Sequence, residues 1–213
     1  MRPRATDVIL VGASGLAREV IAAAGEQIHV VGILDDDPAR HGTQVDGIDV
    51  LGSIADAACF RAQFLICVGS GEGRRAIVAR LADVSISDDR FASFIDRSVR
   101  VPVGCAVLSG SILLAGVVLT AAVTIGRHCV VMPHVTLTHD DTLHDFVTIA
   151  AGAALAGGVT VSEGAYLGMN VSIRQGVTIG PDTMIGMGAV VLSDVPRGET
   201  WAGVPASQLE VSA

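Results

Sequence analysis

Aliphatic residues recur at every sixth position through the second half of the chain. From Val101 to Val191 all sixteen positions of this series are Val, Ile or Leu. An amphipathic helix repeats every three or four residues and a half-buried strand every two, so neither produces this spacing. A period of six is typical of a solenoid in which short strands stack and share one aliphatic core. The sequence therefore predicts a parallel β-helix over this part of the chain.

Small residues accompany the aliphatic series at fixed offsets. Four residues after it, small or β-branched residues recur, and Cys105 and Cys129 fall at this offset. We interpret these two cysteines as small buried hydrophobic residues of the same interior. Directly after the series the chain often carries a residue small enough for a tight corner. These residues are Gly126, Ala150, Ala156, Gly168, Gly180 and Gly186.

Composition and charge exclude several function classes. The net charge of −8 provides no basic surface for nucleic acid or an anionic membrane. No apolar run is long enough to span a membrane, and residues 1–7 do not resemble a signal peptide. The four cysteines form no C-x-x-C pair, which favours a reducing compartment. We therefore expect a cytoplasmic protein with neither nucleic-acid nor membrane partners.

The repeat region is poor in charge. Between Val101 and Val191 only seven residues are Asp, Glu, Lys or Arg. A solenoid with so few charges exposes apolar surface, and such surface usually marks an interface. We therefore expect the protein to form an oligomer.

The first half of the chain has a different pattern. Strands are expected at 7–11, 30–34 and 64–68, with helices after Gly15 and over 74–81. This β-α-β order predicts a Rossmann-like α/β domain with a parallel sheet. Ligands of such sheets bind beyond the carboxyl ends of the strands. Three loops lie there, at Gly12–Gly15, Asp35–Asp37 and Gly69–Gly71.

These loops have the composition of a nucleotide site. A helix that begins after Gly15 presents backbone amides to a phosphate. Asp35 follows Gly15 at the distance along the chain where a carboxylate can accept a ribose hydroxyl. The segment Gly12–Gly15 is not a full G-x-G-x-x-G fingerprint, so a turn that serves only the fold stays an alternative. For Asp36 and Asp37 the alternative is a solvated turn.

The domain has about half the size of a dinucleotide fold, which favours a mononucleotide or nucleotide-sugar site over a dehydrogenase.

His139 is the strongest candidate for catalysis. It follows Leu137 of the series by two positions, and the matching positions three periods before and after it are Ala121 and Gly157, which leave room for a ring. The sequence Thr138-His139-Asp140-Asp141 supplies carboxylates that can orient or polarise the imidazole, and a neutral imidazole is suited to general-base work near neutral pH. The alternative is a surface histidine beside solvated acids. His128 and His134 are expected on the outer face, and we assign them no chemistry.

The order of these features resembles a known family. A short nucleotide-binding domain, a hexapeptide β-helix and the segment Trp201-Ala-Gly-Val-Pro-Ala206 resemble the bacterial sugar O-acyltransferases of the sialic acid O-acetyltransferase (NeuD, PglD-like) family. The resemblance covers almost the entire chain, and Gly12–Gly15 with Leu34-Asp-Asp36 narrows it to this subgroup. It implies a nucleotide-sugar-binding domain over 1–96. It also implies a left-handed β-helix of triangular coils, each made of three repeats, with a C-terminal cap, over 97–213.

The resemblance also implies the ligands and the roles of individual residues. Acetyl-CoA would lie between neighbouring β-helices of a homotrimer, with His139 as the base and Asp140 as the acid that raises its basicity. The residues matched to the CoA site are Thr148, Gly157, Met169 and Met187. Thr148 stands where one relative has a histidine. The residues matched to the sugar-nucleotide loops are Gly12, Ser14, Gly15, Asp35, Asp36 and Gly69. Leu16 stands where the 4-amino-sugar enzymes commonly have a histidine, so the identity of the sugar stays open.

Zinc enzymes of the γ-carbonic anhydrase kind share one spacing with this chain, His139-x4-His144. Their third histidine would fall at residue 103, which is Val103 here. Two imidazoles without a third ligand make a poor zinc site, so we expect no metal.

Together these observations predict an acetyl-CoA-dependent acetyltransferase that acts on an amino group of a nucleotide-linked amino sugar. No cysteine occupies a plausible nucleophile position, which favours direct transfer in a ternary complex. A backbone amide near Gly157 is a candidate donor to the oxyanion. Two alternatives remain: an O-acetyltransferase acting on a free sugar or another small molecule, and a non-catalytic solenoid that binds a ligand.

Overall fold

The computed structural model describes residues 6–209, which divide into two compact units. Residues 6–69 and 73–94 form the first unit, and residues 70–72 and 95–209 form the second. The expectation that the chain has no signal peptide was drawn from residues 1–7. Of these, residues 1–5 lie outside the described residues. No helix in the described part of the chain is both long and apolar enough to cross a bilayer.

The first unit is an α/β domain, as predicted. Its sheet has the order β3-β4-β2-β1-β5, in which β3 is antiparallel to β4 and the other neighbours are parallel. The elements are β1 (Thr6–Val11), α1 (Gly15–Ala24), β2 (Ile28–Leu34), η1 (Pro38–Arg40), β3 (Gln44–Val45), β4 (Ile48–Gly52), η2 (Ile54–Cys59), β5 (Gln63–Ile66), α2 (Gly71–Asp83) and η3 (Asp88–Arg90). Strand β6 (Phe94–Ile95) spans the boundary of the two units and belongs to a sheet of the second.

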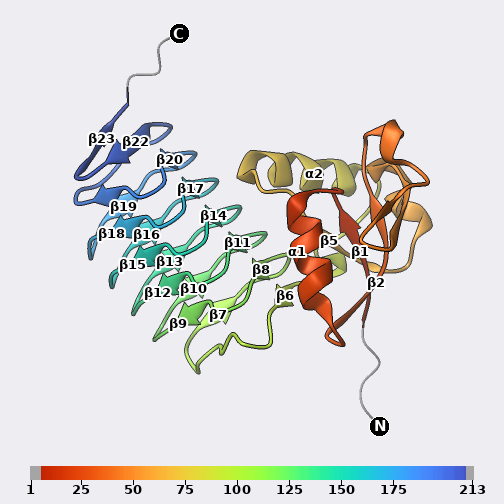
Figure 1. Ribbon diagram of the computed structural model, residues 1–213, viewed down its shortest axis with the longest axis horizontal. Coiled ribbons are helices and arrows are strands. Elements are labelled where there is room, and N and C mark those ends of the chain that lie inside the picture. The colour runs from red at the N-terminus through yellow and green to blue at the C-terminus, as the bar shows by residue number, and fades with distance from the viewer. Residues whose placement is uncertain (1–5, 210–213) are drawn as a thin grey trace. The chain divides into compact units, whose positions relative to one another are not determined.

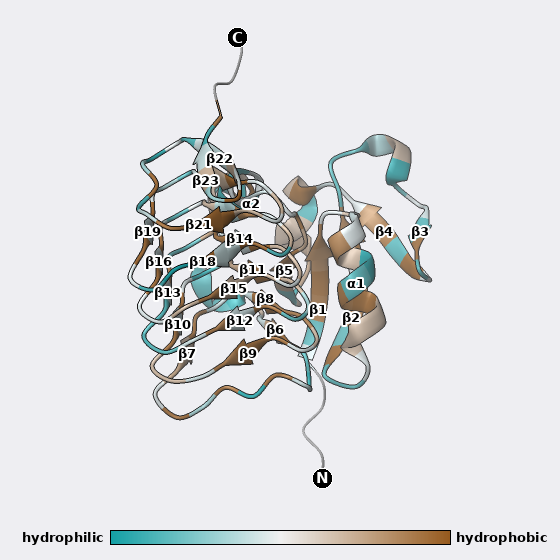
Figure 2. Cartoon of the chain, turned by 60° about the vertical axis from the view of Figure 1, so that its left-hand side comes forward, coloured by the Kyte–Doolittle hydropathy of each residue, from teal (hydrophilic) through white to brown (hydrophobic). Residues whose placement is uncertain are grey.

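Burial explains why β1 lies inside the sheet, between β2 and β5. Val8 to Val11 of β1 are at most 1% exposed, and the strand is brown, the hydrophobic colour, in Figure 2. A continuous apolar run is what a parallel strand covered on both faces requires. The β3–β4 hairpin was not predicted. Its signal is the pair Asp46-Gly47, whose positive φ angles of 48° and 84° suit a two-residue hairpin turn.

The second unit is a three-sided parallel β-helix. Within the described residues, fifteen two-residue strands, β7 to β21, are shared among three sheets, and Figure 1 shows the coils stacked in chain order. The strands are β7 (Ala106–Val107), β8 (Ile112–Leu113), β9 (Val118–Leu119), β10 (Thr124–Ile125), β11 (Val130–Val131), β12 (Thr136–Leu137), β13 (Thr142–Leu143), β14 (Thr148–Ile149), β15 (Ala154–Leu155), β16 (Thr160–Val161), β17 (Tyr166–Leu167), β18 (Ser172–Ile173), β19 (Thr178–Ile179), β20 (Met184–Ile185) and β21 (Val190–Val191).

The aliphatic series forms the core of this unit. The second residue of each strand belongs to the series, and from Leu113 to Val191 none of them is more than 5% exposed. Each strand pairs with the strand one coil, or three repeats, away, as Leu137 does with Leu119 and Leu155. The predicted period is therefore confirmed. Val101 differs, because it precedes the first coil and is 38% exposed.

The corners explain the small residues. A β-carbon on Gly126 would lie 2.7 Å from the backbone nitrogen of Asp145, so close approach of the next coil requires glycine there. The third residue after each member of the series often has a left-handed backbone, as Asp140 does with a φ of 65°. The expected outer-face position of His128 was wrong. Its side chain is buried, and its ring stacks on that of Phe146 in the next coil, with centroids 5.4 Å apart.

A hairpin ends the β-helix. Strands β22 (Thr200–Gly203) and β23 (Ala206–Gln208) pair with each other, and β22 continues the eight-stranded sheet beside β20. The indole nitrogen of Trp201 donates to Glu199 Oε2 at 2.7 Å.

Candidate active site

His139 and Asp140 form a hydrogen-bonded pair at a corner of the β-helix. They follow β12, and His139 Nδ1 lies 2.8 Å from Asp140 Oδ2. The two side chains are 67% and 68% exposed in the single chain. The pair therefore presents an imidazole that is oriented by a carboxylate and open to a ligand.

Gly157 lies directly against the imidazole from the next coil. A β-carbon on Gly157 would overlap Cε1 and Nε2 of His139. The amide of Gly158 donates to the His139 carbonyl at 2.8 Å, which fixes the two turns against each other. The ring edge that carries Nε2 therefore faces the backbone of the Gly157 turn.

Asp141, expected only as one of the carboxylates beside His139, instead bonds the backbone of two turns. Its side chain is fully buried, with Oδ2 accepting from the Thr138 amide at 2.8 Å and Oδ1 from the Val159 amide at 2.9 Å. Burial raises the pKa of this carboxyl to about 6, against the lowering effect of the two amides. The available signal was an acid at the offset of four from the series, where Val predominates.

The other residues matched to CoA lie elsewhere on the coils. Met169 and Met187 stand in neighbouring coils, 50% and 77% exposed, on the corner that follows the eight-stranded sheet. His139 and Gly157 stand on the corner that follows the sheet β21-β18-β15-β12-β9. Thr148 is buried on β14, in the eight-stranded sheet. Within one chain, the two methionines and the histidine are therefore on different corners.

In the first unit, hydrogen bonds join two of the three predicted loops, Gly12–Gly15 and Asp35–Asp37. Asp35 accepts from the amides of Ala13, at 2.7 Å to Oδ2, and Asp37, at 2.9 Å to Oδ1. Arg40, a cation that the sequence analysis did not single out, donates from Nη1 to the Ala13 carbonyl at 2.6 Å. The Asp35 carboxylate therefore fixes the glycine turn through Ala13 and its own loop through Asp37.

Ser14 caps helix α1. Its hydroxyl accepts from the amides of Leu16 and Ala17, and donates to the Cys67 carbonyl at 2.6 Å. Two of the amides expected to meet a phosphate are therefore engaged by the cap. Glycine is required at position 12, because its φ is 101° and a β-carbon there would lie 2.9 Å from Val68 Cγ2 and 3.1 Å from the Cys67 carbonyl oxygen. A β-carbon on Gly15 or Gly69 would meet open space.

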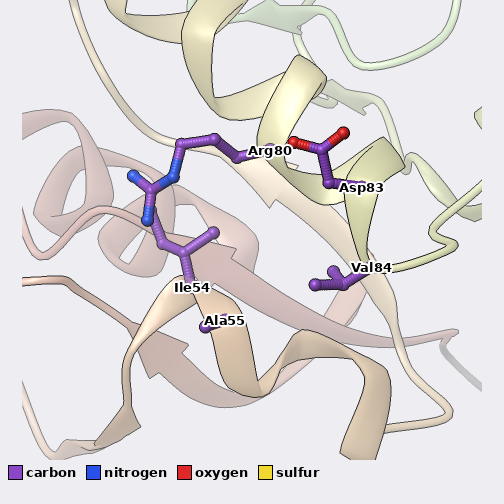
Figure 3. A pocket seen from close by; sticks show the side chains of 5 residues that line it. All are labelled: Ile54, Ala55, Arg80, Asp83 and Val84. Atoms are coloured by element: carbon purple, nitrogen blue, oxygen red, sulfur yellow. The ribbon is translucent and has the colours of Figure 1, made fainter.

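Asp36 has a charged partner. Arg80 Nη1 donates to its Oδ2 at 2.6 Å, and this bond holds the pKa of the carboxyl below its usual value. Figure 3 shows the adjoining cavity of about 170 Å³, with Ile54, Ala55 and Val84 beside Arg80 and Asp83. Typical small-molecule pockets have about 300–1,000 Å³, so this recess is too small to hold a nucleotide sugar.

The described residues contain neither a metal-binding cluster nor a disulfide. Between residues 6 and 209, no three His, Cys, Asp or Glu side chains gather closely enough to hold a metal ion. None of the four cysteines, Cys59, Cys67, Cys105 and Cys129, is in a disulfide, and burial raises the pKa of Cys67. Cys129 is buried as predicted, whereas Cys105 is only half-buried.

Two family profiles match the chain. The profile described as the PglD N-terminal domain matches residues 7–81, and the bacterial transferase hexapeptide profile, with six repeats, matches residues 158–193. No curated protein sequence gives a significant match.

Several solved structures are similar over nearly the whole chain. A histidine-to-alanine variant of GDP-perosamine N-acetyltransferase from Caulobacter crescentus, solved with CoA and GDP-perosamine, is 30% identical with a TM-score of 0.86, covering 96% of this chain and 97% of its own. The acetyltransferase domain of PglB from Neisseria gonorrhoeae, solved with acetyl-CoA, is 27% identical with a TM-score of 0.84, covering 96% and 100%. WeeI from Acinetobacter baumannii is 26% identical with a TM-score of 0.83, also covering 96% and 100%.

These matches decide the family. The two profiles occur in the order of the two structural units, and a relative with 30% identity is covered almost completely. The family resemblance inferred from the sequence is therefore confirmed. The chain belongs to the PglD-like family of hexapeptide-repeat sugar acetyltransferases.

Proposed function

We propose that the protein transfers the acetyl group of acetyl-CoA to the amino group of a nucleotide-linked amino sugar. The observation that carries the proposal is the His139–Asp140 pair, whose Nε2 edge lies over Gly157. An imidazole that is oriented through Nδ1 and about two thirds exposed has the geometry needed to deprotonate an attacking amine.

In the proposed reaction the acetyl group passes directly from acetyl-CoA to the sugar amine, without an acyl-enzyme. With Nδ1–H donating to Asp140, Nε2 carries the lone pair and removes a proton from the sugar amine as its nitrogen attacks the thioester carbonyl. The C–N bond forms, the C–S bond breaks, and His139 returns the proton to the CoA thiolate. The Gly157 amide is our candidate donor to the oxyanion, a contribution that is often worth about 3 kcal/mol.

Acetyl-CoA is the co-substrate, and we place it between neighbouring β-helices of a homotrimer. Met169 and Met187 lie on a different corner from His139, so one chain alone does not bring them together. The corner residues Met169 and Met187 and the strand residues Tyr166 and Met184 are all exposed in the single chain. We call these four residues the apolar strip, and its contact with another copy would bring two corners to one site.

We assign the nucleotide of the acceptor to the loops of the first unit. These loops follow parallel strands and carry the backbone amides, glycines and carboxylates that bind nucleotides. The Caulobacter relative was solved with a GDP-linked amino sugar, so GDP-perosamine is the first acceptor to test. The histidine variants of that relative hold both ligands, which is the behaviour we expect of His139 variants here.

A thiol-release assay tests the proposal. Acetyl-CoA would be incubated with GDP-, UDP- and dTDP-amino sugars and with matched hydroxyl sugars. We expect CoA release with an amino sugar and a loss of about 10²- to 10⁴-fold in His139→Ala, the usual contribution of a general base. CoA binding should survive in that variant. Transfer only to a hydroxyl acceptor, or full activity of His139→Ala, would overturn the proposal.

A further inference from the structure

A buried carboxylate interrupts an apolar column beside the proposed base. Asp141 is fully buried, at a position where the other coils place a small or aliphatic residue. The residues of this column, one from each coil, are Cys105, Val123, Asp141, Val159, Val177 and Val195. Burial of a carboxylate costs free energy unless it is well paired, so the interior of the β-helix alone does not favour an acid here.

Asp141 joins the turn that carries His139 to the turn of the next coil that carries Gly157. One oxygen accepts from Thr138, directly before the histidine, and the other accepts from Val159, directly after Gly157 and Gly158. At the place of Thr138 in the neighbouring coils, the amides of Thr120 and Ala156 donate to the backbone carbonyls of Leu137 and Ile173. At this corner the Asp141 carboxylate therefore accepts the amide hydrogen bond that a backbone carbonyl accepts in the neighbouring coils.

A second unfavourable feature lies in the same turn. Thr138 Oγ1 is buried and, among residues 6–209, has no hydrogen-bond partner. An unsatisfied buried hydroxyl next to a buried carboxylate lowers stability. Two such unfavourable features at one corner, next to the proposed base, are what a functional constraint on the turn would produce.

We propose that Asp141 is a positioning residue: its carboxylate draws the Thr138 and Val159 amides together and thereby holds the His139 ring over Gly157. This inference rests on the role of His139 proposed above. Asp141 touches neither substrate nor the reacting atoms, so its effect on the reaction passes through the backbone of the histidine turn.

The charge on Asp141 determines whether it can do this. Only the carboxylate accepts at both oxygens, since protonation converts one of them into a donor. The titratable groups that face it are His139 and Asp140, on its own turn. The adjoining segments Ala121–Val123 and Gly157–Val159 contain no titratable side chain. Positioning should therefore weaken as the pH falls through about 6.

The test compares two substitutions with a matched control. Asp141→Val restores the residue of the column, and Asp141→Asn keeps the shape but only one acceptor. Asp194→Asn is the control, because Asp194 Oδ1 also accepts a backbone amide, that of Thr178 at 2.8 Å, away from His139. We expect both Asp141 variants to lose about 10- to 100-fold in kcat, as a small misplacement of a catalytic group does. KM for acetyl-CoA should stay within about threefold, and the control should keep full kcat.

Further readouts separate positioning from a structural role. Asp141→Val should unfold at a temperature no lower than the wild type, and the acid limb of its log kcat against pH should be less steep, because one titrating group is gone. Wild-type kcat in both variants, or a loss of kcat matched by an equal loss of folded protein, would overturn the inference. If His139→Ala is inactive while the Asp141 variants are fully active, only this inference fails. If His139→Ala is active, the proposed function fails first.

Discussion

At the scale of single residues, the approach of two coils limits what can stand at position 157. A β-carbon there would overlap the ring edge of His139, and that ring is exposed enough to swing aside. We therefore expect Gly157→Ala to fold normally and to lose about 10- to 100-fold in kcat, because the base moves away from the acceptor. CoA release at saturating substrate measures this loss.

A double variant provides the control for Gly157. If the added methyl group acts by displacing the ring, Gly157→Ala should cause no further loss in a His139→Ala background, since the two changes are then coupled. If Gly157→Ala lowers kcat by the same factor in both backgrounds, Gly157 acts independently of His139.

The repeat explains which site residues the sequence could place. A solenoid brings residues that are three repeats apart into contact, so His139 and Gly157, like Met169 and Met187, could be paired by counting alone. Counting does not identify side-chain partners. The bonds from Asp141 to Thr138 and Val159, and the use of Ser14 as a helix cap, depend on atomic geometry that no spacing encodes.

At the scale of elements, Asp35 holds the glycine turn of the first unit. Its carboxylate bonds the amides of Ala13 and Asp37, so its removal should loosen the loops that we assign to the nucleotide. We expect Asp35→Ala to weaken binding of the nucleotide sugar by about tenfold or more, the effect of losing charge-assisted bonds worth roughly 1.5–3 kcal/mol. Acetyl-CoA affinity should be unchanged. Titration calorimetry with each ligand measures both.

Asp46→Asn is the control for this variant, because asparagine removes the charge and tolerates the positive φ of this turn. Asp46 is an exposed carboxylate of the same unit that pairs with Arg18 outside the glycine turn, so its removal should leave both affinities unaltered. A loss of acetyl-CoA affinity in Asp35→Ala, with nucleotide-sugar affinity intact, would mean that the two ligands are assigned to the wrong units.

The histidine turn should also make stability depend on pH. The pKa of Asp141 is about 6 in the folded protein and about 4 in an unfolded chain. The folded state thus holds this proton more tightly than the unfolded state. The contribution of the protonated Asp141 to the free energy of unfolding is therefore fully present below about pH 4 and is lost as the pH rises through about 6. Relative to Asp141→Val, the unfolding free energy of the wild type should fall by up to about 3 kcal/mol between pH 4 and 7.

Urea denaturation of both proteins across this pH range measures the difference. Other carboxyl groups titrate in both proteins and largely cancel in the comparison. A difference between the two that is constant from pH 4 to pH 7 would contradict the raised pKa.

Element boundaries were predictable where burial was complete. Strand β1 and the strands of the β-helix have strongly apolar patterns, and the sequence located them. The β3–β4 hairpin at the sheet edge was missed because Val50 is the one buried residue of its two strands, so it lacks a continuous apolar run. Its turn, Asp46-Gly47, was the better indicator.

At the scale of the whole molecule, the apolar strip formed by Tyr166, Met169, Met184 and Met187 should be covered by another copy of the chain. We expect light scattering of the purified protein to give about three chains, because a closed ring buries such a face on every subunit. Met184→Glu should weaken this assembly, whereas Gln175→Glu, at an exposed polar position, should not. An active, monodisperse monomer would contradict the shared site.

The pairing of each coil with the next has a consequence for insertions and deletions. A whole coil gained or lost on the C-terminal side of Val177 changes the length of the solenoid but leaves the separation of His139 and Gly157 unaltered. A single residue inserted between them shifts every later side chain out of its column. Evolution can therefore lengthen or shorten this scaffold in steps of one whole coil, while the short segment from Leu137 to Val159 tolerates no change in length.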